Sequence, residues 1–262
     1  MKRQTRILPI RFILGGLSLF FFFAVWWWIA VSDPRGVLPT PQEIFTTIVR
    51  ILVTNERDFT GHVFSDHVAS SLLRVFYGFI LAAAVAIPVG LLSGWSVYIE
   101  SISKPIVELL RPIPPFAWIP FAIIFFREPF DSAFIVYLGA FFPILLSTTA
   151  GVKAVDSVLI DAAKTLGAKR RQLFRKVIVP ASIPHIMTGI RIGLGIGWMT
   201  IVAAELVGVK GGGLGVYIHS MSDIGRFDNV FAGMFLIGII GFIMITTVSY
   251  IERRFSRWAG IH

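Results

Sequence analysis

The chain lacks cysteine altogether and has few charged residues. Only 15% of its 262 residues are charged, whereas an ordinary soluble domain is about a quarter charged. The absence of cysteine excludes a disulfide framework, a thiolate metal site and a cysteine nucleophile. The shortage of charge excludes a soluble enzyme, a disordered tail and a nucleic-acid binder whose basic patch faces water, because too few charges remain to cover a water-facing surface.

Apolar residues are abundant instead. They make up 55% of the chain, and its mean hydropathy is +0.78. A helix needs about 20 apolar residues to cross the hydrocarbon core of a bilayer. We therefore predict an all-α, polytopic membrane protein with a single transmembrane domain over residues 1–262. Its six predicted transmembrane helices are 13–31, 75–94, 105–126, 132–151, 186–209 and 230–250.

The first predicted span has basic residues in front of it, as a signal peptide would. It is longer than the 7–15 apolar residues of a signal-peptide core. Three tryptophans, Trp26 to Trp28, lie near its far end, where an aromatic belt anchors a true span. We interpret the segment as a retained transmembrane helix.

Lysine and arginine are distributed unevenly between the two sides of this topology. With the N-terminus inside, the inner segments hold fifteen of them and the outer segments six. This asymmetry satisfies the positive-inside rule with both termini cytoplasmic. It also explains most of the net charge of +9 without a nucleic-acid partner.

The long internal segment 154–184 has a helical pattern of its own. Small and apolar residues recur at helical spacing along its first part. Gly167 is placed to end that first helix in the left-handed conformation that glycine adopts readily. The apolar strip consists of Val158, Ala162, Ala163 and Leu166.

A second short helix is predicted over 169–177. It presents Leu173, Phe174 and Val177 on one face and basic residues elsewhere, and Pro180 is expected to end it. From these patterns alone, two interpretations stay open. The segment is either a knob that fits a groove on another protein or a basic loop that only fixes topology.

The same segment resembles the EAA signature of permease subunits of ATP-binding-cassette importers. The resemblance rests on Asp161-Ala162-Ala163, on Gly167 four residues after Ala163, and on Val177-x-Val179-Pro180. The chain departs from the signature by Asp at 161 and Val at 177 and 179. In that family the loop forms a coupling helix that docks on the cytoplasmic ATPase. The residues to which the resemblance assigns this contact are Asp161, Ala162, Ala163, Leu166, Gly167, Phe174 and Pro180.

Further stretches are similar to the nitrate, sulfonate, taurine and bicarbonate branch of these permeases. The resemblance implies a type I importer permease fold and ATP-driven uptake of a small anion delivered by an extracytoplasmic solute-binding protein. It implies two further partners, a cytoplasmic ATPase dimer that binds Mg-ATP and a second permease copy in a homodimer. It also implies that the protein lies in the inner membrane. The stretches are Arg111 to Pro120, Thr188 to Arg191, Ala203-Ala204-Glu205, Gly213-Leu214-Gly215, Glu252-Arg253-Arg254 and Trp258.

The chain itself shows no site for nucleotide phosphates or for a metal. It contains no G-x-x-x-x-G-K-[ST] pattern and no Gly-Lys dipeptide. The five histidines are scattered without zinc spacing. We therefore expect no cofactor and no enzymatic activity in this chain, with ATP hydrolysis performed by a separate subunit.

Ionisable residues within predicted spans each cost about 2.5–3.5 kcal/mol by insertion scales, so each needs a reason. Arg111 either pairs with Glu108, three residues earlier, or lines an anion path. Arg191 either reaches the inner interface or bonds to another helix. Prolines break backbone hydrogen bonding at 111–118, a break that lipid tolerates only beside other protein or a water-filled cavity. The candidate path residues are Arg111, Pro114, Pro115, Trp118, Arg191, Trp198 and Glu205, with Trp118 and Trp198 as gating aromatics.

Glycines recur every four residues at Gly189, Gly193 and Gly197. Such a stripe allows close helix packing. Packing within the bundle is the favoured interpretation, with substrate contact or contact between two permease copies as alternatives. A different class of function, a secondary transporter coupled to an ion gradient, would show inverted repeats and carboxylates near the midplane, and neither is evident. A purely structural scaffold is a third hypothesis, disfavoured by the loop.

Overall fold

The computed structural model describes residues 7–34, 36–54, 61–208 and 211–258, and every regular element within these ranges is a helix. The elements in chain order are α1 (Ile7–Ser32), α2 (Pro41–Thr54), α3 (Phe64–Trp95), α4 (Val97–Leu110), η1 (Pro115–Trp118), α5 (Ile119–Phe125), α6 (Phe130–Lys153), α7 (Ser157–Thr165), α8 (Arg170–Leu173), η2 (Phe174–Ile178), α9 (Val179–Val207), α10 (Leu214–Asp223) and α11 (Phe227–Trp258).

The described helices confirm the prediction of an all-α polytopic membrane protein. Five stretches are long and apolar enough to cross a bilayer, and a bent helix pair brings the number to six if it is counted as one span. The five stretches are Ile13–Ser32, Phe64–Trp95, Phe130–Lys153, Arg170–Val207 and Phe227–Arg253.

The predicted third span, 105–126, is not one helix. α4 begins earlier, at Val97, and the axis turns by 86° between α4 and the pair formed by η1 and α5. Pro112, Pro114 and Pro115 supply no backbone N–H, and their rings clash with the preceding turn of a continuing helix. The prolines therefore divide the segment, as expected, but they also redirect it.

Several helices extend beyond their apolar runs. α3 starts at Phe64 rather than at 75, and α9 starts at Val179 rather than at 186 and passes through Pro184. The prediction that Pro180 ends a helix is wrong. Pro180 lies in the first turn of α9, where the lack of a backbone N–H costs least because the first N–H groups of a helix have no partner within it.

The chain divides into two compact units. The first comprises Met1–Ser65 and Tyr217–Leu236. In it Arg50 forms an ion pair of 2.8 Å with Asp228. The Tyr217 hydroxyl accepts a 2.8 Å hydrogen bond from Asn229, and burial raises the pKa of Tyr217. α2 is amphipathic and buries Ile44, Thr47 and Ile51.

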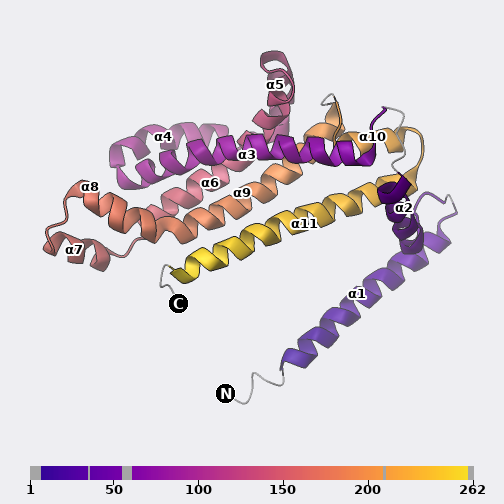
Figure 1. Cartoon of the computed structure of the whole chain (residues 1–262), viewed down its shortest axis with the longest axis horizontal. Helices are drawn as coiled ribbons and strands as arrows, with labels where there is room; N and C mark the ends of the chain where they lie inside the picture. The colour runs from indigo at the N-terminus through magenta and orange to yellow at the C-terminus, as the bar shows by residue number, and fades with distance from the viewer. Residues whose placement is uncertain (1–6, 35, 55–60, 209–210, 259–262) are drawn as a thin grey trace. The chain divides into compact units, whose positions relative to one another are not determined.

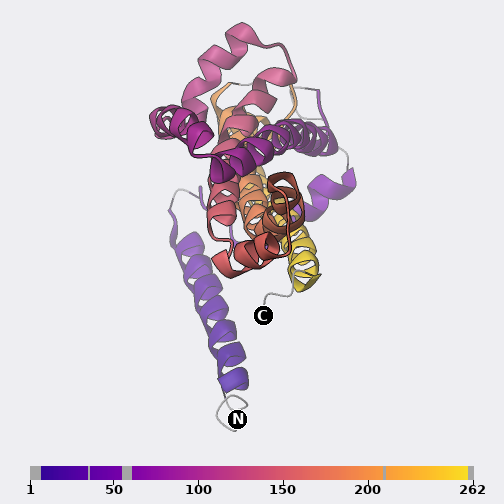
Figure 2. The same ribbon diagram turned by 90° about the vertical axis from the view of Figure 1, so that its left-hand side faces the viewer.

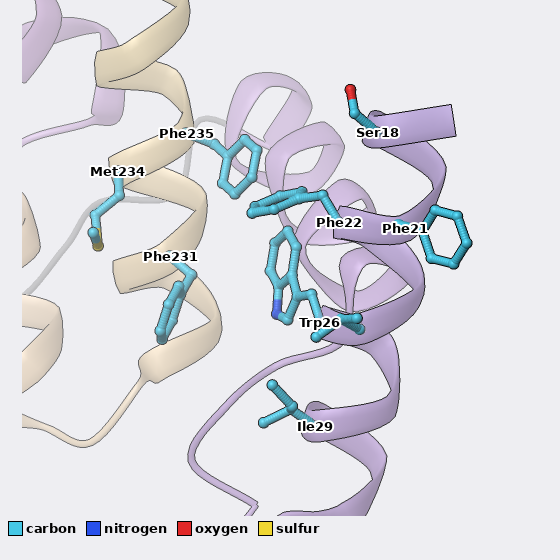
Figure 3. Close-up of a pocket in the computed structure, with 9 residues that line it drawn as sticks. Ser18, Phe21, Phe22, Trp26, Ile29, Phe231, Met234 and Phe235 are labelled. Atoms are coloured by element: carbon cyan, nitrogen blue, oxygen red, sulfur yellow. The ribbon is translucent and has the colours of Figure 1, made fainter. Parts of the chain in front are cut away.

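An apolar groove of about 630 Å³ lies between α1 and the first turns of α11 within this unit. Trp26 stacks on Phe235 with ring centres 5.5 Å apart, and Figure 3 shows both rings facing the groove. Its lining contains no charged residue, which makes it unsuitable as an anion path. The lining residues are Ser18, Phe21, Phe22, Val25, Trp26, Ile29, Phe231, Met234 and Phe235.

The second unit comprises Asp66–Val216 and Ile237–His262, and α6 is its central helix. α3 packs on one side of α6 and α9 on another (Figure 1). A Cβ added at Gly90 would lie 2.7 Å from the Thr148 side chain, and one added at Gly189 would lie 2.7 Å from the Ser147 side chain. Both contacts need glycine, because real Cβ atoms do not approach so closely.

The glycine stripe of α9 is therefore a packing surface. Gly189, Gly193 and Gly197 all face α6 of the same chain. This confirms the favoured interpretation and corrects the alternatives, since a stripe occupied by α6 is not available to substrate or to a second copy.

Candidate functional site

The segment between α6 and α9 forms a compact loop at one end of the second unit. Figures 1 and 2 show α7 and α8 beside the turn between α3 and α4. The Asp156 side chain caps the start of α7 by accepting from the Val158 N–H at 2.9 Å. Gly167 ends this helical turn with φ at +77°. The predicted left-handed position is thus confirmed.

Most of the apolar strip on α7 is exposed among the described residues, and Ala163 is half-buried. The exposed fraction of Leu166 is 87% and that of Val158 is 69%. Asp161 is also exposed and pairs locally with Lys164 at 3.1 Å. Exposed apolar side chains on a short, well-capped helix indicate a surface that another molecule covers.

The second half of the loop is anchored rather than free. Leu173 is buried, and the Phe174 ring lies 5.6 Å from the Trp95 ring at the end of α3. The predicted helix over 169–177 is a single turn of α-helix followed by a π-helical turn that continues into α9. Phe174, assigned by resemblance to the ATPase contact, therefore also holds the loop against the membrane-spanning helices.

Arg111 lies at the break between α4 and η1 and borders a cavity of about 410 Å³. The α6 residues in the cavity wall come from the middle of that helix. The volume lies within the range of small-molecule sites. The lining residues are Arg111, Ile113, Pro115, Leu138, Gly139, Phe142, Pro143, Leu146, Ser147, Ile192 and Ile196.

The pair between Glu108 and Arg111, one of the two alternatives for Arg111, is not formed. Glu108 lies 3.9 Å from Lys104 instead, and Arg111 has no ion-pair partner among the described residues. Because Lys104 is one turn before Glu108 on α4, the two can meet without distortion, whereas the proline break turns Arg111 toward α6 and α9. Arg111 is thus a cation facing a mostly apolar cavity, and Ser147 supplies a hydroxyl to its wall.

The other candidate path residues lie in different surroundings. Pro115 shares the cavity with Arg111, while Pro114 precedes the first turn of η1. Trp118 packs edge-to-face on Phe121 at 5.7 Å. Trp198 is buried, and its indole N–H donates to the Ile237 carbonyl of α11 at 3.3 Å.

Arg191 forms an ion pair of 3.0 Å with Glu252 of α11. Thr188, one turn earlier on α9, donates to the other oxygen of the same carboxylate at 3.0 Å. Of the two possibilities left open for Arg191, the structure shows the bond to another helix. Two of the stretches that carry the resemblance to the permease branch, Thr188 to Arg191 and Glu252 to Arg254, therefore contact each other through these bonds.

Glu205 lies at the centre of a buried polar cluster at the opposite end of α3 from the loop. Its side chain is fully buried and forms a 3.0 Å ion pair with Arg74. The Ser71 hydroxyl lies 2.8 Å from each carboxylate oxygen. The Gly215 N–H donates to the carboxylate at 3.0 Å. We call the cluster of Arg74, Ser71, Glu205 and the 211–215 turn the buried lock.

The turn before α10 is shaped around this carboxylate. A Cβ added at Gly213 would lie 2.5 Å from the Glu205 carboxyl carbon, so only glycine fits. Arg74 also bonds to Glu128 at 2.6 Å and to the Gly212 carbonyl. The resemblance at Ala203-Ala204-Glu205 and Gly213-Leu214-Gly215 therefore corresponds to one structural contact.

Sequence reasoning did not find the partners of Glu205. Ser71 and Arg74 are one turn apart on the same face of α3, immediately before the apolar run that begins at residue 75. This spacing could have indicated a polar site. Their pairing with Glu205 was not visible because Arg74 and Glu205 are 131 residues apart.

Arg74→Gln is expected to lower the free energy of unfolding by about 3–5 kcal/mol, because it leaves the fully buried Glu205 carboxylate without its cation. Thermal unfolding in detergent measures the effect. Lys104→Gln is the matched control, since it removes one partner of an exposed pair worth about 0–1 kcal/mol. Equal melting temperatures for the two variants would contradict a stabilising role of the buried lock.

A helical protein with five or six candidate spans is a polytopic membrane protein, and this one carries a capped loop and a cavity bordered by Arg111. Residues 86–259 match the family described as the inner membrane component of binding-protein-dependent transport systems. The chain belongs to this family of ABC transporter permeases, which are transport components rather than enzymes.

Similar known proteins are also ABC transporter permeases. A putative ABC transporter permease of Methanocaldococcus jannaschii is 46% identical over 194 residues, which are 74% of this chain and 73% of the relative. The taurine transport system permease TauC of Escherichia coli is 39% identical over 85% of this chain and 80% of its own length. The putative aliphatic sulfonates permease SsuC of Bacillus subtilis is 34% identical, covering 85% and 78%.

Solved structures show the same fold. The MetNI methionine ABC transporter in an inward-facing conformation matches with a TM-score of 0.63 at 20% identity, covering 80% of this chain and 98% of that chain. The type I importer permease fold predicted from the loop and its flanking stretches is thereby confirmed.

Proposed function

We propose that the chain is the membrane-spanning subunit of an ATP-driven importer of a small anion of the sulfonate, taurine, nitrate or bicarbonate type. A solute-binding protein delivers the anion to the external face. The observation that carries the proposal is the exposed, capped α7 strip on a chain of this family, since it is a ready contact for a separate ATPase dimer. Relatives named for taurine, aliphatic sulfonates and nitrate support a substrate that carries an anionic sulfonate or nitrate-like group.

The orientation follows from charge. We propose that both termini and this loop lie in the cytoplasm, because lysine and arginine are in excess in the terminal segments and in the α7–α8 loop. Lys2, Arg3 and Arg6, which contribute to the excess, lie outside the described residues. In this orientation α7 faces the compartment that holds ATP. Basic side chains around the loop steer the ATPase, and the apolar strip supplies most of the affinity.

Arg111 and its cavity are the proposed anion site. The planar guanidinium presents paired donors that match the oxygens of nitrate, bicarbonate or a sulfonate. An anion in an apolar cavity gains more from this charge than it would in water, because the local dielectric constant is lower. Pro114, Pro115 and Trp118 shape the break that presents Arg111. Arg191, Trp198 and Glu205 contribute to the path only indirectly, through helix packing, because each already has a partner.

The permease works as a pair, and we propose a homodimer whose two copies bind the ATPase dimer. The rival function, a secondary transporter, is not favoured. The sequence shows no inverted repeats, and the fully buried Glu205 is paired with Arg74.

The proposed function predicts which solutes accumulate. Proteoliposomes containing the chain, its ATPase and its binding protein are expected to concentrate at least one of taurine, an alkanesulfonate, nitrate or bicarbonate when ATP is supplied. Accumulation of a sugar or a cation, with none of these anions taken up, would refute the assignment.

Gly167→Pro is expected to uncouple transport from ATP hydrolysis. Proline fixes φ near −65°, whereas Gly167 has φ at +77° and donates its N–H to the Lys164 carbonyl at 2.9 Å. The variant therefore reshapes the turn that presents the apolar strip. A charge in place of Ala163, on the same strip, should have the same effect. The measurement is ATPase activity of the reconstituted complex with and without loaded binding protein.

Gly225, with φ at +73°, offers a matched control. Alanine at either glycine costs about 1–2 kcal/mol in the left-handed region, but only Gly167→Ala should reduce stimulation of the ATPase. Full stimulation in Gly167→Pro would remove the loop from the coupling mechanism.

A further inference from the structure

Trp95, the last residue of α3, contacts the loop through two side chains. The Arg170 guanidinium lies over its ring, 5.6 Å from the ring centre. The Phe174 ring lies 5.6 Å away on the following turn. Both distances are typical of favourable cation–π and aromatic contacts. One indole thus holds α8 and the first residue of the π-helical turn.

The other end of the loop is attached at the same place. Lys153, the last residue of α6, forms an ion pair with Glu100 in the first turn of α4. A Cβ added at Gly94 would lie 2.5 Å from the Val152 side chain, so the end of α3 lies directly on the last turn of α6. The residues that begin the loop and those of α8 that follow it therefore both contact the turn between α3 and α4.

The connection from the loop to α9 is a different kind of element. Phe174–Ile178 is a π-helical turn between two α-helical segments. Such turns are rare, less regular than α-helix and frequent at functional sites. The π-helical turn can bend when the angle of α8 changes. The contact of the loop with Trp95 is therefore a more rigid connection than its link to α9.

α4 joins this attachment to the anion cavity. It carries Glu100 near its start and ends immediately before Arg111. A 3.0 Å contact between the hydroxyls of Ser93 and Ser103 ties α4 to α3. A second cavity, of about 180 Å³, runs along α4 from Glu100 to Arg111 against α6. This space allows α4 to shift on α6.

We propose that Trp95 is a positioning residue that couples the loop to the α3–α4 turn, so that movement of the loop shifts α4 and with it Arg111. This inference rests on the proposed function, because it assigns a route to the movement that the ATPase drives. Trp95 itself touches neither substrate nor nucleotide. Its expected effect is on the ratio of transport to ATP hydrolysis.

The test uses the complete complex in proteoliposomes. Trp95→Ala is expected to capture the ATPase and hydrolyse ATP as before, while anion uptake per ATP falls about tenfold, within the range of mutations along a coupling route. Trp95→Phe keeps an aromatic ring for Arg170 and Phe174 and should restore most of the ratio. Trp28→Ala, at an exposed tryptophan of α1, is the control and should change nothing.

A distance measurement separates coupling from a merely structural role. Because the chain has no cysteine, spin labels attach only to introduced ones, such as Leu109→Cys on α4 and Met199→Cys on α9. ATP should change the distance between the labels with Trp95 in place and leave it unchanged in Trp95→Ala.

The outcomes distinguish this inference from the proposed function. Failure of the unaltered chain to take up anion with ATP would overturn the proposed function. Normal uptake per ATP in Trp95→Ala, in a complex whose unaltered form transports, would overturn the inference alone. If Trp95→Ala does not assemble, Arg170→Gln is measured instead. A fall in anion uptake per ATP in Arg170→Gln supports the coupling role of Trp95, and unchanged uptake per ATP overturns it.

Discussion

Leu166→Asp is expected to abolish capture of the ATPase by the permease. Leu166 is 87% exposed at the end of α7, so the substitution leaves the core of the permease intact. In the complex, the carboxylate would be buried against an apolar groove without a partner. An unpaired buried charge costs several kcal/mol, and each 1.4 kcal/mol is about a tenfold change in affinity. We therefore expect affinity to fall about 100-fold or more.

The cost to the permease itself is too small to explain such a loss. A negative charge near a helix C-terminus destabilises by about 0.3–1 kcal/mol. Ile224→Asp, at an exposed apolar residue beyond α10, controls for added surface charge and should leave capture unchanged. Phe174 is a poorer probe than Leu166, because its contact with Trp95 also supports the loop. Undiminished pull-down of the ATPase by Leu166→Asp would refute the docking surface.

Arg111→Ala is expected to reduce anion uptake about tenfold to 100-fold while leaving the amount of assembled complex nearly unchanged. Hydrogen bonds to a charged group contribute about 1.5–3 kcal/mol, and Arg111 has no ion pair among the described residues to lose. Uptake per assembled complex, measured in proteoliposomes over a range of substrate concentrations, gives the effect.

Two further variants sharpen the result. Arg111→Lys keeps the positive charge without the planar fork, so uptake should be intermediate. Glu108→Gln disrupts only the 3.9 Å contact with Lys104 and should transport normally. Similar losses in Glu108→Gln and Arg111→Ala, or normal uptake in Arg111→Ala, would remove Arg111 from the anion path.

The membrane-spanning helices were predictable because hydropathy alone identifies apolar runs of sufficient length. Their ends were not. The first turns of α3 contain Ser71 and Arg74, whose polar groups looked like the end of a span until Glu205 and the 211–215 turn supplied partners. Hydropathy does not register such compensation, because it evaluates each segment without its neighbours.

The loop was the most predictable part of the candidate site. The position of Gly167 and the α7 strip follow from local spacing, and local rules govern short capped helices. The helix through Pro180 was not predictable, because a proline fits either the end of one helix or the first turn of the next, and the local sequence does not decide between them. The position of Arg111 likewise depended on the direction of a bend, which the prolines imply but do not orient.

The most direct test of the central claim is uptake by proteoliposomes that contain the chain with and without its ATPase. We predict anion uptake that requires ATP, the ATPase and the binding protein, and that persists when ionophores collapse every ion gradient. Uptake by the chain alone, driven by an ion gradient and abolished by ionophores, would contradict the account and establish a secondary transporter.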